Sequence, residues 1–187
     1  MFIPMLKRLL LILNIVFLAK LGLSQNLFVV SEGNVGFTSD APLELIQADT
    51  DDIQGVLKTT ERSFAFRVKM ETFRGFNNSL QRTHFQENYL ETEKYPYTIF
   101  EGKIIEDINL YSPGEYNVRG KGKFTCHGVE KERIIKTKIE VKPDRISIKA
   151  DFSILLADHN ITIPSVVSQK LADEVSAEVE MILKPKQ

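Results

Sequence analysis

Apolar and polar residues alternate one by one through four long stretches of the chain, at residues 62–70, 115–126, 145–155 and 175–183. Successive side chains of a β-strand point to opposite faces of its sheet, so this alternation predicts strands with one apolar and one polar face. Shorter runs rich in β-formers bring the expected total to about nine strands. These runs are residues 34–39, 43–48, 53–57, 97–102 and 134–141.

Turn-forming residues separate the runs. Gly, Pro, Asn or Asp stand at the positions where tight connections are expected. These segments are SEGN at 31–34, DTDD at 49–52, SPGE at 112–115 and KPDR at 142–145. We find no internal repeat, low-complexity tract or linker, so the pattern predicts a single domain.

Two segments interrupt the strand pattern and predict short helical pieces near 78–94 and 165–172. The first opens with capping Asn and Ser residues, places Leu80, His84 and Phe85 at helical spacing, and ends before Pro96. The fold class expected is all-β with minor helix. An antiparallel sheet of this length is expected to curl into a barrel or sandwich, because closure removes exposed edges.

The N-terminal residues have the pattern of a secretory signal peptide. Lys7 and Arg8 precede an apolar run from Leu9 to Ala19, and Gly22 and Ser24 are small residues before a cleavage site. The run is short for a bilayer span, although an uncleaved anchor is the alternative. We therefore expect residues 1–24 to be removed, leaving one domain at 25–187, without a stable membrane span, in the periplasm or, alternatively, secreted.

Net charge limits the classes of partner that are expected, and the cysteine content limits the possible disulfides. The formal charge of −1 for the whole chain becomes −4 when the three basic residues of the signal segment are removed. A mildly acidic surface argues against nucleic-acid binding. The single cysteine, Cys126, excludes an internal disulfide, so the fold depends on its core.

The adjacent pair Cys126 and His127 raises the question of a nucleophile or a metal site. Neighbouring strand residues point to opposite faces, so we expect Cys126 to act as a small buried hydrophobe and His127 to begin a tight turn with Gly128. His84, at helical spacing, and His159, expected in a solvated loop, complete no local metal motif. No catalytic residue, metal or cofactor is predicted.

Three motifs, HFQENYLETEKYP, GKFTCHGVEKE and ITIPSVVSQKLADEVSAEVEMILKP, occur in the order and spacing of the YceI-like family of exported, lipocalin-like proteins. The resemblance extends from about Phe28 to Leu183. It implies an extended antiparallel β-barrel whose interior holds a long apolar molecule. The ligand type associated with the family is a polyisoprenoid chain such as the tail of a quinone.

The apolar strand faces and the helical segment supply the predicted cavity lining. A barrel of about eight strands can be filled by side chains or can hold one slender ligand. Gly120, Gly122, Ala150 and Ala177 lie on the inward face and favour a cavity, although glycines also serve curvature and close packing. The lining set is Phe37, Phe64, Phe66, Val68, Phe73, Phe76, Phe85, Tyr89, Phe100, Phe124, Ile148 and Phe152.

Arg82 and His84 are the predicted headgroup contacts. The expected function is non-catalytic binding, carriage or sequestration of a polyisoprenoid or quinone-like lipid. Two alternatives stay open: a structural or partner-binding barrel with a filled core, and a lipid-modifying enzyme with inward polar groups. A homodimer is an open alternative to a monomer.

Overall fold

The computed structural model describes residues 26–186, so the predicted signal peptide lies outside the described part. Nine strands make one antiparallel sheet. They are β1 (Leu27–Ala41), β2 (Glu44–Thr50), β3 (Ile53–Lys58), β4 (Ser63–Lys69), β5 (Tyr97–Ile104), β6 (Gly114–Cys126), β7 (Val129–Val141), β8 (Ile146–Leu155) and β9 (Glu174–Pro185).

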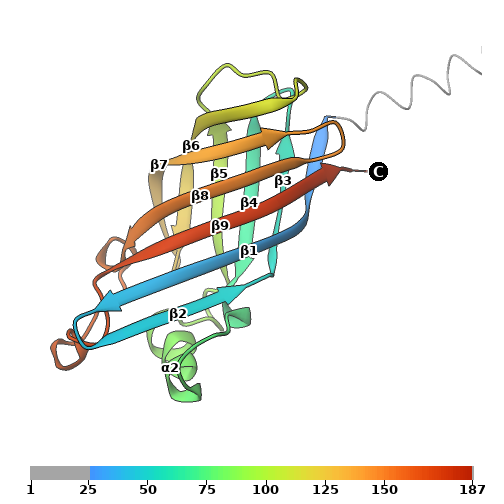
Figure 1. The fold of residues 1–187 in the computed structure, drawn as a ribbon. Coiled ribbons are helices and arrows are strands. Elements are labelled where there is room, and N and C mark those ends of the chain that lie inside the picture. The colour runs from blue at the N-terminus through green and yellow to red at the C-terminus, as the bar shows by residue number, and fades with distance from the viewer. Residues whose placement is uncertain (1–25, 187) are drawn as a thin grey trace, which may run out of the picture.

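The sheet closes into a barrel because β1 pairs with β9 along most of its length (Figure 1). The first residues of β1 pair with β3, and residues from Val35 to Ala41 pair with β2. Eight strands, β1 and β3 to β9, therefore form the closed ring, and β2 continues alongside the other end of β1. The predicted fold class, an all-β antiparallel barrel with minor helix, is confirmed.

The helical pieces lie at the same end of the barrel (Figure 1). The first consists of α2 (Ser79–His84) and the π-helical turn η2 (Phe85–Tyr89), and the Asn78 side chain caps it by accepting from the Gln81 backbone N–H at 2.9 Å. The second is shorter than predicted, a 3-10 turn η4 (Ser165–Val167). Two further 3-10 turns follow β4 and β8, namely η1 (Met70–Thr72) and η3 (Leu156–His159).

The predicted turn at residues 31–34 is wrong, because β1 passes straight through this segment. A register shift between Val30 and Glu32 marks a bulge against β9, which absorbs the extra residue, and the Ser31 hydroxyl donates to the Ile182 carbonyl at 3.0 Å. Gly33 does not form a turn. It allows the Ile53 side chain to pack closely against the β1 backbone, since an added Cβ would lie 2.5 Å from Ile53 Cγ2.

The turn after Cys126 is confirmed as a two-residue hairpin connection between β6 and β7. His127 and Gly128 both have positive φ angles, +48° and +71°, as a turn matched to the twist of the strands requires. The connection at 142–145 between β7 and β8 is also a tight turn, as predicted.

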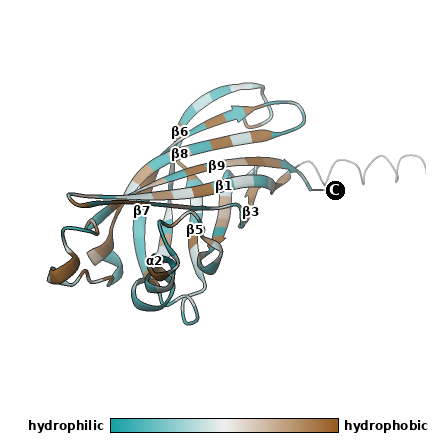
Figure 2. Cartoon of the chain, turned by 60° about the horizontal axis from the view of Figure 1, so that its bottom comes forward, coloured by the Kyte–Doolittle hydropathy of each residue, from teal (hydrophilic) through white to brown (hydrophobic). Residues whose placement is uncertain are grey.

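Packed side chains close the barrel at the end opposite α2. Leu57, Ile139, Ile146 and Leu183 are almost fully buried there, together with Leu110 from the β5–β6 connection. The Tyr116 hydroxyl donates to the Ser112 carbonyl at 2.9 Å and fastens that connection to β6. Hydrophobic and hydrophilic residues alternate along the strands of the barrel wall (Figure 2). We call this the closed end, and the end that carries α2 and η4 the open end.

Candidate functional site

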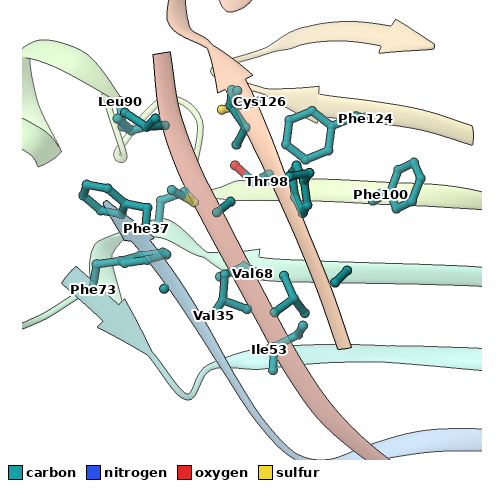
Figure 3. A pocket seen from close by; sticks show the side chains of 18 of the residues that line it. Val35, Phe37, Ile53, Val68, Phe73, Leu90, Thr98, Phe100, Phe124 and Cys126 are labelled. Carbon is teal, nitrogen blue, oxygen red and sulfur yellow. The ribbon is translucent and has the colours of Figure 1, made fainter. Parts of the chain in front are cut away.

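The barrel encloses an apolar cavity of about 510 Å³. Its wall comes from the inward faces of the strands, and its open end is bordered by α2, η2 and residues 167–171. Figure 3 shows side chains from several strands converging on this space. The volume falls in the range of small-molecule binding pockets.

All twelve residues of the predicted lining set lie on the cavity wall. Their contact with a ligand stays a prediction. The wall also contains apolar residues outside that set, and the same strand alternation identifies all of them as inward-facing except Leu90, which follows η2. The additional residues include Val35, Ile46, Ile53, Leu57, Met70, Leu90, Ile104, Val118, Ile135, Ile139 and Val179.

One cluster of aromatic rings fastens the helical segment to the barrel. Phe37 of β1 stacks on Phe85 at 5.4 Å between ring centroids, and it packs against Phe73 at 5.6 Å and Phe76 at 6.0 Å. Such aromatic pairs stabilise packing beyond the area that they bury. The cluster joins β1 to residues more than thirty positions later and forms part of the cavity wall at the open end.

A second row of rings runs along the cavity wall from β4 to β8. Phe64 lies 4.9 Å from Phe100, Phe100 lies 6.3 Å from Phe124, and Phe124 lies 6.0 Å from Phe152, all between ring centroids. Gly120 lies beneath Phe64, and a Cβ at Gly120 would come within 3.2 Å of that ring. The small residue thus makes room for phenylalanine rings on the wall.

Ala150 and Ala177 line the cavity, as the inward pattern indicates. Gly122 instead serves close packing of strands. An added Cβ there would lie 2.0 Å from the Glu101 carbonyl oxygen, and Gly102 opposite would meet the Lys121 backbone in the same way. Of the two explanations considered for these small residues, the cavity explanation fits the alanines and the packing explanation fits Gly122.

Few polar groups face the interior. Thr98 Oγ1 is buried without a nitrogen or oxygen hydrogen-bond partner in the described residues, and Cys126 points into the same region (Figure 3). Burial raises the pKa of the Cys126 thiol, which disfavours the reactive thiolate. Within residues 26–186 no group of three His, Cys, Asp or Glu side chains could hold a metal ion.

Polar residues collect at the open end. Glu44, Asn78, Gln81, His84 and Lys170 border the cavity there, and Gln81 donates to the Glu44 carboxylate. Of the two predicted headgroup contacts, the structure places His84 on the cavity border.

Arg82 is exposed on α2 and does not line the cavity. The side chains at i and i+2 on a helix point in different directions, which explains why Arg82 and His84 separate.

The expected solvated loop at His159 is wrong, because the side chain is completely buried. Its Nδ1 lies 3.1 Å from the Val129 carbonyl oxygen, and its ring meets Phe124 edge-on at 5.4 Å. Burial lowers the pKa of His159. The η3 turn folds this residue beneath the β6–β7 hairpin, a contact between distant segments that the local sequence does not reveal.

Within residues 26–186 no helix is long and apolar enough to cross a membrane. No curated protein sequence matches the chain. Solved structures do match it in fold. A polyisoprenoid-binding domain from Saccharophagus degradans has a TM-score of 0.71 at 13% identity, over 85% of this chain and 98% of that domain.

Two further solved structures have the same fold. BcnA of Burkholderia cenocepacia has a TM-score of 0.65 at 14% identity, over 80% of this chain and 95% of BcnA. The YceI protein of Campylobacter jejuni has a TM-score of 0.61 at 16% identity, over 76% of this chain and 86% of that protein. The sequence profile of the YceI-like domain matches residues 29–183. The chain therefore belongs to the YceI-like domain family.

Proposed function

We propose that this protein binds a long apolar lipid, a polyisoprenoid or quinone-like chain, inside its barrel and carries or sequesters it without catalysis. The observation that carries the proposal is the shape of the cavity. It is walled by aliphatic and aromatic side chains, it ends against the buried cluster at the closed end, and its polar residues gather at the open end. A slender apolar chain with a polar headgroup would fit this arrangement, with the chain in the cavity and the headgroup at the open end.

The driving force is removal of hydrocarbon from water. Burial of apolar surface contributes roughly 25 cal/mol per Å², or about 0.8 kcal/mol for each buried methylene, less the cost of ordering the chain. Many isoprene units can therefore give tight binding without a specific polar contact. His84 at the cavity border is assigned to the headgroup, whereas Arg82, exposed on α2, lies outside the cavity.

The solved relatives support the same class of ligand. The Saccharophagus degradans protein that shares this fold is described as polyisoprenoid-binding, and the family assignment covers nearly all of the described chain. The signal-peptide pattern predicted for residues 1–24 supports a proposed site of action outside the cytoplasm, in the periplasm.

The two other candidate functions have less support. A filled core is at odds with a cavity of about 510 Å³. An enzyme would need an activated inward group, whereas Cys126 is buried with a raised pKa and His127 turns away from the cavity toward Glu91.

Native mass spectrometry of protein purified from the exporting compartment without detergent tests the proposal. We expect the native mass to exceed the denatured mass by one apolar molecule, to be identified after organic extraction. Protein that is bare as purified, and still bare after incubation with quinones and polyprenols, would contradict lipid binding.

A further inference from the structure

Three large aliphatic side chains stand exposed around the open end of the barrel. We call them the apolar rim: Leu43 at 66% exposure, Leu80 at 61% and Val166 at 88%. They have the three highest exposures among the large hydrophobic side chains of the described residues. Single exposed leucines are ordinary, whereas a contiguous apolar patch marks an interaction surface.

Hydrogen bonds hold the three segments of the rim side by side. The Leu43 backbone N–H donates to the Gln169 carbonyl at 2.9 Å, which joins the β1–β2 turn to the segment after η4. On its other side, the Asn77 side chain donates to the Leu45 carbonyl at 3.0 Å. The β1–β2 hairpin thus bridges the segment carrying Val166 and the segment carrying Leu80, so the rim side chains come from three distant parts of the chain that the fold brings side by side.

The apolar rim is continuous with the cavity. Leu80 belongs to both, since it is exposed and also lines the cavity, and Val167 and Leu171 line it beside Val166. Figure 2 shows hydrophobic residues on the helical turns that project beyond the strands at this end. A hydrocarbon chain leaving the cavity would meet apolar side chains before it met water.

The charges near the rim are of both signs. Arg82 and Lys170 are exposed there, but so are Asp40 at the end of β1 and Asp173, and none of these four side chains forms an ion pair within residues 26–186. The Glu44 carboxylate at the cavity border adds a further negative charge. Charge therefore does not draw the rim to lipid phosphates, and apolar contact must supply the binding.

We propose that the apolar rim docks on the surface of a lipid bilayer, with the open end of the cavity facing the membrane. This docking explains how a lipid could reach the cavity. Passing a chain through water costs about 0.8 kcal/mol for each exposed methylene, whereas a docked rim keeps the chain in apolar surroundings. The transfer step rests on the proposed function, while the docking itself does not.

Vesicle flotation of the mature protein tests the docking. The vesicles contain phosphatidylethanolamine and phosphatidylglycerol, and the test variant combines Leu43→Ser, Leu80→Ser and Val166→Ser. We expect the variant to lose vesicle affinity by at least about tenfold, since three aliphatic side chains no longer enter the interface. The matched control is Ile134→Ser, which replaces a side chain 55% exposed on the barrel wall, and it should bind vesicles like the native protein.

Equal vesicle binding by the native protein and the triple variant would overturn the proposal, and so would native protein that does not bind vesicles. Circular dichroism shows whether the triple variant is folded. If it is not, the single Val166→Asp change at the most exposed rim position gives the same decision. A second copy of the chain is the competing occupant of the rim, and sedimentation velocity on the same samples detects it. Membrane docking would be rejected if the native protein were a dimer that dissociates in the variant while vesicle binding persists.

Ligand uptake separates this inference from the proposed function. A fluorescent polyprenyl probe is offered either in vesicles or by dilution from ethanol. For this assay the variant is Leu43→Ser with Val166→Ser, which keeps the cavity-lining Leu80. We expect this double variant to take up the diluted probe normally and the vesicle probe at least about fivefold more slowly. Native protein that takes up neither probe would refute lipid binding, while vesicle flotation would still test the docking of the rim. A double variant that draws the probe from vesicles at the native rate would reject the rim as the route of transfer.

Discussion

The imidazole Nε2 of His127 lies 2.7 Å from the Glu91 carboxylate. The other ring nitrogen, Nδ1, lies 3.0 Å from the His159 carbonyl oxygen, and the ring of Tyr95 meets the imidazole edge-on at 4.8 Å. The β6–β7 hairpin is thereby joined both to η3 and to the segment that follows η2. His127 therefore links three segments of the chain near the cavity, and none of these ring contacts involves its neighbour Cys126.

Removing the Glu91 carboxylate should loosen the helical segment. We expect Glu91→Ala to lower the free energy of unfolding by about 1 kcal/mol, because a partly exposed hydrogen bond to a charged group is lost. Urea unfolding measures the change, and hydrogen exchange should quicken at residues 85–95. Glu93→Ala is the control, since the exposed Glu93 forms no ion pair within residues 26–186. Equal exchange in the two variants would mean that the His127 contact does not hold the segment.

His159 should make stability depend on pH. Burial lowers its pKa below the ordinary value of 6.5, so the unfolded chain binds a proton at a higher pH than the folded protein does. Stability is therefore expected to fall as the pH drops through 6.5 and to stop falling, as far as this residue is concerned, below the folded pKa. Urea unfolding midpoints measured between neutral and mildly acidic pH give the slope of stability against pH.

The matched variant is His159→Gln, whose amide can still donate to the Val129 carbonyl. It should be less stable at every pH, yet its midpoint should change less on acidification than that of the native protein. An unchanged slope would assign the pH dependence to other groups.

Filling the cavity should block the ligand. Ala150 lines the cavity, and Ala150→Phe would place a ring in the space proposed for the lipid chain. We expect at least a tenfold weaker uptake of an apolar fluorescent probe, equivalent to about 1.4 kcal/mol. Asp151→Phe adds the same ring one residue later, on the exposed face, and should bind the probe like the native protein. Similar binding by both variants would place the ligand elsewhere.

Replacing Thr98 should stabilise the protein without ligand. Its buried hydroxyl has no nitrogen or oxygen partner within residues 26–186 and interacts there with the Cys126 thiol, a weak hydrogen-bonding group, so Thr98→Val removes a poorly satisfied polar atom at nearly constant volume. We expect the free energy of unfolding to rise by about 1 kcal/mol. Thermal melting measures the effect.

The control for this change is Thr50→Val. Thr50 is also buried, but its hydroxyl lies 2.6 Å from that of Thr72 and accepts from the Asp52 N–H at 3.1 Å. This variant should melt at a lower temperature, because bonded partners are left unsatisfied. A lower melting temperature for Thr98→Val as well would show that Thr98 is satisfied by a group such as the Cys126 thiol.

Strand alternation by itself determined the strands and which of their side chains share a face, while the choice of a barrel over a sandwich came from the family resemblance. Side chains of a strand alternate between faces wherever the strand lies, so the inward positions of Phe64, Phe124 and Phe152 follow from local sequence alone. The turn at His127 and Gly128 is equally local, because two positive φ angles suit a tight hairpin. The family resemblance supplied the expectation of a ligand inside.

Only the tertiary structure decided the features that depend on contacts between distant segments. Residues 31–34 carry turn chemistry, yet pairing with β9 keeps them in a strand. His159 looks like a loop residue, yet η3 buries it under the β6–β7 hairpin. The apolar rim joins residues near 43, 80 and 166, which no local pattern connects. Backbone pairing and packing across the barrel override local preference at these places, since closure fixes which segments meet.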